Sequence, residues 1–340
     1  MSTFFSSLNA QSLVLMRLAL MLLAAFGLSR VAKLLKLPNV TGYIISGILI
    51  GPYVTGLIPK DMVNGMSFLT DAALALIAFG TGKYFKWETI RSSGSKIIIL
   101  TVMEALVAAV AVTLAMIFIF HLDVPFSLLL GAIASATAPA STLMTIRQYK
   151  AKGEFVDTVL QVVALDDVVG LVLYSVAISV ALASVAGGSG FSLRTLAQPV
   201  ILNLLVLALG GVFGLFMKLL MPQKRSTDNK LIISIALLFT FCGACTLLDL
   251  SPLLGCMMMG TVYTNIAEDD KLFKQLNYFS PPILLLFFVR SGMSFRLDAL
   301  VSASGDLGGV PLLVIGVGYF FVRILGKYAG AWLGCRLVKK

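Results

Sequence analysis

The 340-residue sequence is poor in charged side chains, which make up 12% of it, and it contains one histidine and four cysteines. Soluble proteins carry about 25% charged residues, so the composition excludes a soluble enzyme or a nucleic-acid-binding protein. The few cysteines exclude a disulfide-stapled secreted domain. What the chain has instead is 59% hydrophobic residues and a mean hydropathy of +0.98. These values indicate an all-α polytopic membrane protein that is embedded in the lipid bilayer.

Hydrophobic runs bounded by charged residues, Pro or Gly predict the membrane-spanning segments. We expect eleven of them, at about residues 12–29, 40–58, 66–82, 97–120, 125–146, 155–185, 196–221, 231–248, 251–266, 278–295 and 308–335. The first ten residues have no basic segment, so we expect no cleaved signal peptide. Cys242 and Cys245 form a C-x-x-C pattern inside a span, which we interpret as apolar packing because further metal ligands are lacking there.

The connections between these segments alternate between basic and non-basic. The N-terminal segment and the connections after even-numbered spans hold Lys60, Arg194 and Arg296. The other connections and the C-terminal end hold most of the remaining lysines and arginines: Arg30, Lys33, Lys36, Lys83, Lys86, Arg91, Lys96, Arg147, Lys150, Lys152, Lys218, Lys224, Arg225, Lys230, Lys271, Lys274, Arg336, Lys339 and Lys340. Because basic loops stay in the cytoplasm, we expect the N-terminus outside and the C-terminus in the cytoplasm.

Two segments of the sequence resemble each other. Residues 76–88 read LIAFGTGKYFKWE and residues 286–298 read LFFVRSGMSFRLD, with Gly82 and Gly292 in matching positions. An odd number of spans separates them, so the second copy would be inverted in the membrane, as in secondary transporters. A chance match between two apolar segments is the alternative.

The repeat predicts the domain organisation. We expect residues 1–340 to form one transmembrane transport domain. It would comprise a first repeat at about 12–185, a linker span at about 196–221 and an inverted repeat at about 231–340. At the same spacing, the counterparts of residues 131–185 would lie beyond Lys340, so the second repeat is expected to be truncated.

Two adjacent carboxylates, Asp166 and Asp167, lie well inside the hydrophobic segment 155–185. A charge at the centre of a bilayer costs at least about 2.5–3.5 kcal/mol on insertion scales, and two adjacent carboxylates titrate as a coupled pair. Neighbouring residues on a helix point about 100° apart, so one can line a water-filled cavity while the other meets a fixed cation. A buried polar network without a transport role is the alternative.

The preceding span has a predicted break at Pro139. Proline removes a helix hydrogen bond and biases Ala138 away from helical geometry, and Ser135, Thr137 and Ser141 surround this point. Transporters use unwound carbonyl groups of this kind to coordinate small cations. A proline kink stabilised by hydroxyl groups is the alternative.

The last span carries two cations four residues apart, Arg323 and Lys327, which therefore share one helix face. Gly326, Gly330 and Gly334 form a stripe that allows close helix packing. A buried lysine can pair with an aspartate, whereas one near the interface can extend to water. Glu104 and Arg290 are further intramembrane charges for which the sequence shows no partner, so structural pairing and a transport role both stay open.

Taken together, the sequence resembles the monovalent cation:proton antiporter-2 family of the cation:proton antiporter superfamily. The resemblance rests on Thr137-Ala138-Pro139, Asp166-Asp167, the segment 287–293 and Gly326-Lys327-x-x-Gly330, in this order along nearly the whole chain. It implies an inverted-repeat sodium/proton antiporter fold with a broken helix. Family members often carry Asp where this chain has Ala138. They also have two more helices, including a second broken one.

The resemblance also implies functional roles. Asp167 would bind the transported Na⁺ and exchange it for a proton, with Thr137 and nearby carbonyls completing the ion site. Asp166 would pair with a cation of the last span, for which Lys327 is the better match and Arg323 the alternative. We accordingly expect an electrogenic Na⁺ (or Li⁺)/H⁺ antiporter without cofactors, acting as a homodimer in a bacterial inner membrane.

Other functions remain open at this point. A K⁺/H⁺ antiporter of the same family is the nearest alternative, followed by a channel or a non-transporting subunit. An intramembrane enzyme is disfavoured because Asp166-Asp167 is followed by Val168-Val169-Gly170, which matches neither an intramembrane protease nor a diphosphate-binding motif.

Overall fold

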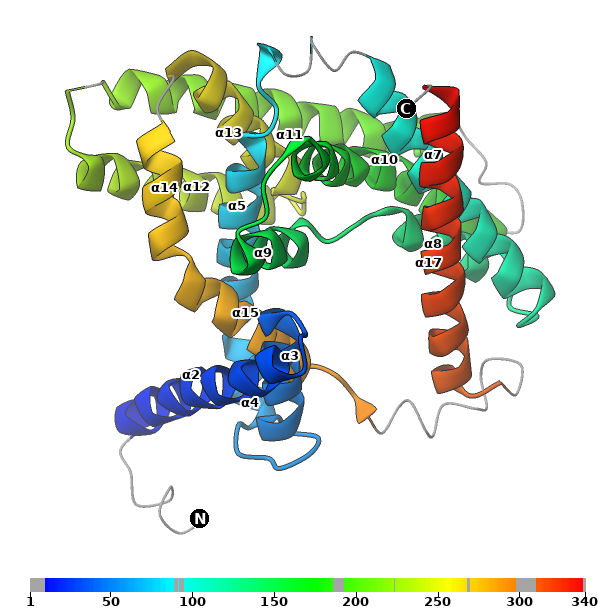
Figure 1. The fold of residues 1–340 in the computed structure, drawn as a ribbon, viewed down its shortest axis with the longest axis horizontal. Coiled ribbons are helices and arrows are strands. Elements are labelled where there is room, and N and C mark those ends of the chain that lie inside the picture. Colours follow the sequence, from blue (N-terminus) through cyan, green and yellow to red (C-terminus); the bar gives the residue numbers. More distant parts are fainter. Residues whose placement is uncertain are drawn as a thin grey trace.

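The computed structural model describes residues 10–88, 91, 95–185, 193–222, 224–267, 270–297 and 310–338. These residues form helices and connections, with no strand among them. The helices are α2 (Ala10–Leu34), α3 (Asn39–Ile50), α4 (Lys60–Gly65), α5 (Ser67–Gly82), α7 (Ser95–Phe118), α8 (Val124–Ser135), α9 (Pro139–Tyr149), α10 (Glu154–Val185), α11 (Leu193–Leu220), α12 (Thr227–Leu247), α13 (Leu253–Ala267), α14 (Asp270–Phe279), α15 (Pro281–Met293) and α17 (Leu312–Leu337). Figure 1 shows their arrangement.

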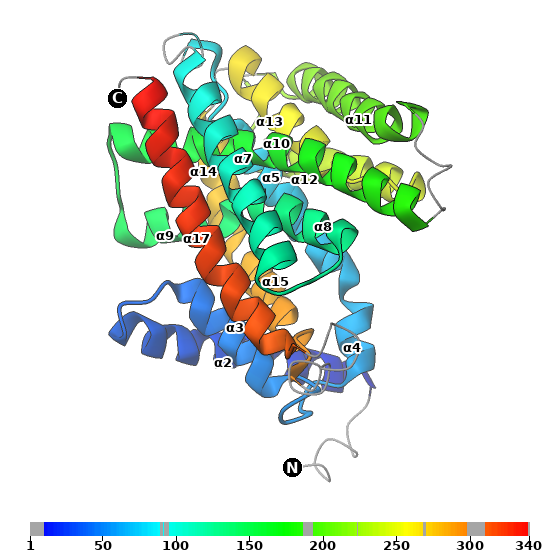
Figure 2. The ribbon, with the colours of Figure 1, turned by 90° about the vertical axis from the view of Figure 1, so that its right-hand side faces the viewer.

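The helices form two groups. We call α7, α8, α9, α10 and α17 the polar bundle, since it contains the Asp pair; in it α17 packs along α7, and α7 and α10 pack on α8. Figure 2 shows the red α17 running beside α7 and α8. We call α2–α5 and α11–α15 the apolar bundle, in which α3 packs on α15 and α13 packs on both α5 and α11.

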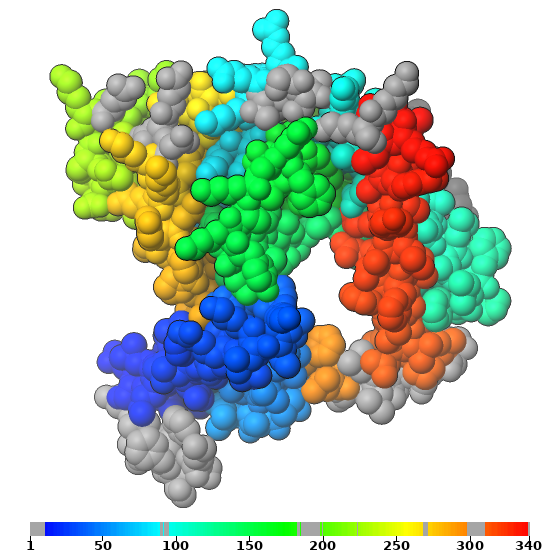
Figure 3. Space-filling view, in the orientation of Figure 1, coloured from blue at the N-terminus to red at the C-terminus, as the bar shows by residue number. Residues whose placement is uncertain are grey.

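The two bundles meet mainly through α9 and α10, which contact α3, α5 and α11. Elsewhere they stand apart, and the space-filling view shows an opening between the red α17 and the helices α3 and α9 (Figure 3). The bundles are therefore joined along the interface that α9 and α10 form.

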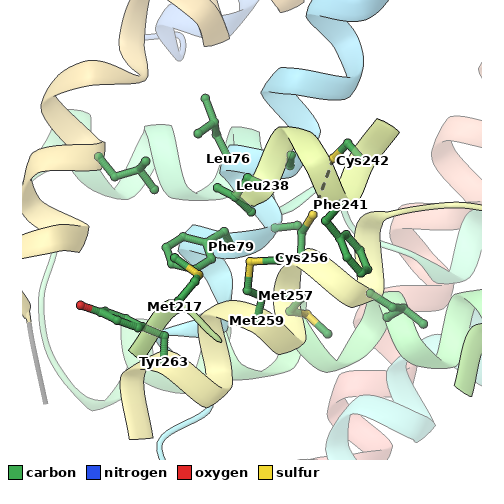
Figure 4. Packing of buried hydrophobic residues seen from close by; sticks show 14 of the residues in the cluster. Leu76, Phe79, Met217, Leu238, Phe241, Cys242, Cys256, Met257, Met259 and Tyr263 are labelled. Carbon is green, nitrogen blue, oxygen red and sulfur yellow. Dashed lines mark hydrogen bonds between the residues drawn. The ribbon is translucent and has the colours of Figure 1, made fainter. Parts of the chain in front are cut away.

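The core of the apolar bundle combines aliphatic side chains with many aromatic and sulfur-containing ones (Figure 4). Phe79 is fully buried and its ring is stacked on Phe273, with centroids 5.2 Å apart. Cys242 and Cys256 belong to this core, with their Sγ atoms 3.8 Å apart. Both cysteines are free and buried, and Cys242 contributes to this core as a packed side chain.

The described residues contain fewer full-length spans than the eleven expected from the sequence. Eight segments are long and apolar enough to cross a membrane, or nine with the bent pair α14–α15. The predicted spans 40–58 and 251–266 correspond to α3 and α13, which have 12 and 15 residues. A bilayer core needs about 20 helical residues, and α3 ends earlier because Gly51, followed by Pro52, leaves helical geometry.

The predicted span 278–295 also differs from the structure. Here α14 and α15 are bent by 48° at Ser280. Pro281 is the first residue of α15 and Pro282 follows it. Neither proline can donate a backbone hydrogen bond to the preceding turn, so the helix is bent at this point although Ser280 keeps helical backbone angles.

Candidate functional site

The predicted break lies in the middle of the span Val124–Tyr149. Helix α8 ends at Ser135 and α9 begins at Pro139, while Ala136 and Ala138 are extended, with ψ angles of 148° and 108°. The last carbonyl groups of α8 have no helical N–H group to accept from. The broken helix predicted from Pro139 is therefore confirmed, and it leaves free acceptors inside the membrane.

Two cations of α17 bind those carbonyl groups. Arg323 donates from Nε to the Ala134 oxygen at 3.1 Å and from a terminal nitrogen to the Ala136 oxygen at 2.6 Å. Lys327 Nζ donates to the Ser135 oxygen at 2.6 Å. Positive charge is favourable at a helix C-terminus. The end of α8 is thus held by side-chain cations.

Asp166 is completely buried where α10 passes the break. Its Oδ2 atom lies 2.9 Å from Lys327 Nζ and accepts a hydrogen bond from the Thr137 hydroxyl at 2.5 Å. Between the two cations considered from the sequence, the structure places Lys327 beside Asp166 and leaves Arg323 on backbone carbonyl groups. Asp166 therefore has a fixed counter-charge.

Asp167 follows on the same helix but has different surroundings. It is half-buried, and no described residue makes a hydrogen bond or an ion pair with its carboxylate. The 100° rotation between neighbours on a helix separates the two side chains, so one carboxylate is occupied by Lys327 while the other has no protein partner among the described residues.

The hydroxyl groups near the break do not all face the aspartates. Thr137 accepts from Lys327 at 2.7 Å and donates to Asp166, so it joins the two. The hydroxyl groups of Ser135 and Ser141 donate to the carbonyl oxygens of Ala132 and Ala138 in their own helix turns. Thr137 is thus the hydroxyl that belongs to the charged cluster, and it lies on Asp166 rather than on Asp167.

Glu104 of α7 is a residue of the site whose partner the sequence did not reveal. Its Oε1 atom lies 2.8 Å from Lys327 Nζ, and its side chain is 12% exposed. The one feature of the sequence that pointed to Glu104 is the high energetic cost of placing a carboxylate inside the membrane. The pairing depends on the packing of α7 against α17, which hydropathy cannot show.

The glycines of α17 produce that packing. A side-chain Cβ atom at Gly330 would lie 2.7 Å from the Glu104 Cα atom, and one at Gly326 would lie 2.9 Å from Ala108 Cα. Gly334 faces Leu100 in the same way. The stripe expected from the sequence is confirmed as the contact between α17 and α7, and it brings Lys327 to Glu104.

Arg290, the other intramembrane charge left open, lies in the apolar bundle. It donates to the Val63 carbonyl oxygen at 3.0 Å and to the Thr70 hydroxyl at 2.7 Å. These partners are neutral and lie on α4 and α5. Arg290 therefore connects α15 to the neighbouring span and does not reach the charged cluster.

A known family of membrane proteins matches this chain. The model of the family described as sodium/hydrogen exchanger, transmembrane, matches residues 18–339. The chain belongs to this sodium/hydrogen exchanger family. It is accordingly an integral membrane protein with several spans and a cation/proton antiporter.

The chain is also similar to two antiporter sequences. The ammonium/H⁺ antiporter subunit AmhT of Alkalihalophilus pseudofirmus is 26% identical over 329 residues, which cover 94% of this chain and 79% of the relative. The probable Na⁺/H⁺ antiporter 2 of Methanocaldococcus jannaschii is 23% identical over 296 residues, which cover 80% of this chain and 67% of the relative.

Solved structures show the same exchanger fold. The structure of the sodium proton antiporter MjNhaP1 from Methanocaldococcus jannaschii at pH 8 matches with a TM-score of 0.68 and 19% identity, over 94% of this chain and 78% of the other. An electron-microscopy map of MjNhaP1 gives 0.74 and 18%, over 98% and 79%. The sodium/proton antiporter fold predicted from the sequence is confirmed.

Proposed function

We propose that this exchanger moves Na⁺ against H⁺ and that Asp167 is the residue that binds each in turn. The observation that carries the proposal is the difference between the two aspartates. Asp166 is occupied by Lys327 and Thr137, whereas the Asp167 carboxylate has no partner among the described residues. A free carboxylate inside the membrane gains most from a bound proton or cation, and binding one displaces the other.

The surroundings of the break refine the proposed roles. The carbonyl groups of Ala134, Ser135 and Ala136 already accept from Arg323 and Lys327. We therefore propose that the Thr137 hydroxyl orients Asp166. The cation would first bind to Asp167 and to water molecules. This assignment modifies the expectation that Thr137 and the carbonyls hold the ion directly.

The arrangement of the bundles supports exchange by alternating access. Helices α9 and α10 carry the break and the Asp pair, and they are also the main contacts to the apolar bundle. A movement of the polar bundle along this interface would expose Asp167 to one side at a time. Neutralising the Asp167 charge makes this movement less costly, which couples the two ions. We further propose that exchange is electrogenic, since more than one carboxylate in the cluster can carry a proton.

Contacts within the molecule support the proposed orientation, with the N-terminus outside and the C-terminus in the cytoplasm. Tyr149 donates to the Lys36 carbonyl oxygen at 3.3 Å, and Arg147 donates to Asn277 at 2.6 Å. Three of the basic connections therefore meet at one face, as the charge rule requires of cytoplasmic loops. A homodimer in a bacterial inner membrane is proposed from the family resemblance.

The inverted repeat is likewise a proposal, supported by the way its two copies pack. Helix α3 contacts α15 next to Gly47 and Gly292, and α5 contacts α13 next to Gly82 and Gly260. A pseudo-twofold axis would exchange these two pairs. Asp298, the last residue of the second copy, lies outside the described residues.

Ion selectivity has a second candidate. One relative is named as part of an ammonium/H⁺ antiporter, and K⁺ is close to ammonium in size. Exchange should therefore be compared with NaCl, LiCl, KCl and NH₄Cl. We expect the largest response to Na⁺ or Li⁺; a larger response to K⁺ or ammonium would replace the Na⁺ proposal by this alternative.

The test of the proposed function is Asp167→Asn in everted membrane vesicles, with the pH difference followed by a fluorescent dye after NaCl is added. We expect the variant to lose cation-dependent proton movement. Asp71→Asn is the matched control because Asp71 is an exposed carboxylate in the span of α5 and should leave exchange unchanged. Undiminished exchange by Asp167→Asn would contradict the proposal.

A further inference from the structure

Glu104 of α7 and Asp166 of α10 both contact the same ammonium group. Lys327 Nζ is 2.8 Å from Glu104 Oε1 and 2.9 Å from Asp166 Oδ2. It also donates to the Ser135 carbonyl oxygen at 2.6 Å and to the Thr137 hydroxyl at 2.7 Å. An ammonium group has three N–H donors, so four oxygens share three donors. The two carboxylates therefore compete for Lys327.

Each of the two carboxylates also has one oxygen atom without a hydrogen-bond partner among the described residues. Glu104 Oε2 and Asp166 Oδ1 are buried and accept no hydrogen bond among the described residues. An unpartnered buried oxygen is costly, and a proton or a change of partner removes this cost. Both carboxylates are thus incompletely satisfied by the single lysine that they share.

The charges around Lys327 do not balance. Glu104 on α7 and Asp166 on α10 pair with Lys327 on α17. Asp167 follows Asp166 on α10, and Arg323 lies one turn before Lys327 on α17. Helix α8, which also packs here, has no ionisable side chain. With all five groups ionised, the cluster carries one excess negative charge, which one proton or one monovalent cation would neutralise. Without Glu104, two carboxylates and two cations would remain and their charges would balance.

From this geometry we propose that Glu104 is the alternative partner of Lys327 and sets the pH range of exchange. When Asp166 takes a proton from water, its interaction with the ammonium weakens, and Lys327 keeps its three protons because Glu104 still pairs with it. When Asp166 releases the proton to water, it shares Lys327 again. Glu104 is thus a positioning residue that acts through Lys327 without binding the transported cation. The inference rests on the proposed exchange at Asp167.

The test compares Glu104→Gln, Glu104→Asp and the control Asp71→Asn with the unchanged chain in proteoliposomes, using NaCl as the probe. The rate is measured across pH, together with the number of protons moved per Na⁺ under a clamped membrane potential. Removing one negative charge from the cluster should move the pH of half-maximal exchange toward acid by about one unit. Glu104→Asp should give a smaller shift in the same direction, because its charge lies one methylene further from Lys327.

Several results would overturn the inference. A Glu104→Gln variant with an unchanged pH profile and unchanged coupling, even if its melting temperature falls, would show that Glu104 has only a structural role. If that variant does not accumulate in the membrane, a Glu104→Asp profile identical to that of the unchanged chain has the same meaning. The proposed function fails separately, through Asp167→Asn, and can stand when the Glu104 inference fails.

Discussion

The polar and apolar bundles are built from similarly hydrophobic helices, yet their centres differ. In the apolar bundle the centre is filled by side chains such as Phe79, Met259 and Tyr263. In the polar bundle, Lys327 lies between two carboxylates next to a broken helix. Both bundles are therefore hydrophobic enough for a membrane, and they differ in a few charges with fixed partners, which lie in the bundle for which we propose ion exchange.

Arg290 and Lys327 show the difference between the bundles in two single residues. Arg290 is an intramembrane cation of the apolar bundle, and Lys327 is one of the polar bundle. Arg290 donates to neutral oxygens of Val63 and Thr70, whereas Lys327 faces ionisable groups. A cation on neutral acceptors has no partner whose charge changes with pH. We therefore expect Arg290 to affect stability and Lys327 to affect both stability and exchange.

The largest effect is expected for Lys327→Ala. It removes the counter-charge of Asp166 and Glu104, and breaking a buried pair costs about 3–5 kcal/mol. The melting temperature in detergent should fall strongly, and the pH profile of exchange should change. Lys327→Arg keeps the charge and should be closer to the unchanged chain. Equal stability of Lys327→Ala and the unchanged chain would show that the ion pairs contribute little.

The next effect is expected for Arg290→Gln. Losing hydrogen bonds from a charged donor costs about 1.5–3 kcal/mol, so the melting temperature should fall. The pH profile of Na⁺-dependent exchange should stay in place, because Arg290 contacts neither aspartate. A shifted pH profile would remove the distinction between the two cations.

A smaller effect is expected for Gly330→Val. The new side chain would meet the Met103 carbonyl oxygen and the Glu104 Cα atom, and overpacking costs about 1–3 kcal/mol. It should push α17 away from α7 and lower exchange along with stability. Gly316→Val, in the same helix, is the control because no atom lies within 4 Å of the place that its Cβ atom would take. Similar losses for both variants would contradict the role of the stripe.

The smallest effect is expected for Met259→Leu in the core of the apolar bundle. Met259 is fully buried, and swaps that conserve volume cost less than about 1.5 kcal/mol. Exchange and its pH profile should not change.

The matching substitution in the polar bundle is the near-isosteric Asp166→Asn. It should change the pH profile, since it removes the charge that faces Lys327. If Met259→Leu shifted the pH profile as much as Asp166→Asn does, the proposal that exchange depends on the polar bundle would be contradicted.

Much of the fold followed from local features of the sequence. Proline has no N–H group, so the break at Pro139 was predictable from one residue and its neighbours. The stripe at Gly326, Gly330 and Gly334 likewise predicted a close helix contact. Span lengths were less predictable: α3 and α13 are shorter than hydropathy suggested, because a hydrophobic run continues through turns that end a helix.

The sequence by itself determined the class of protein, the family resemblance, the broken helix and the aspartate pair, because bilayer insertion and proline geometry act on local segments. The tertiary structure decided which charges meet. Glu104, Asp166 and Lys327 are far apart in the sequence, and the contacts at 2.8 and 2.9 Å exist because α17 packs closely on α7 beside α10. Hydropathy reports the cost of each charge but contains no information on which partner offsets it.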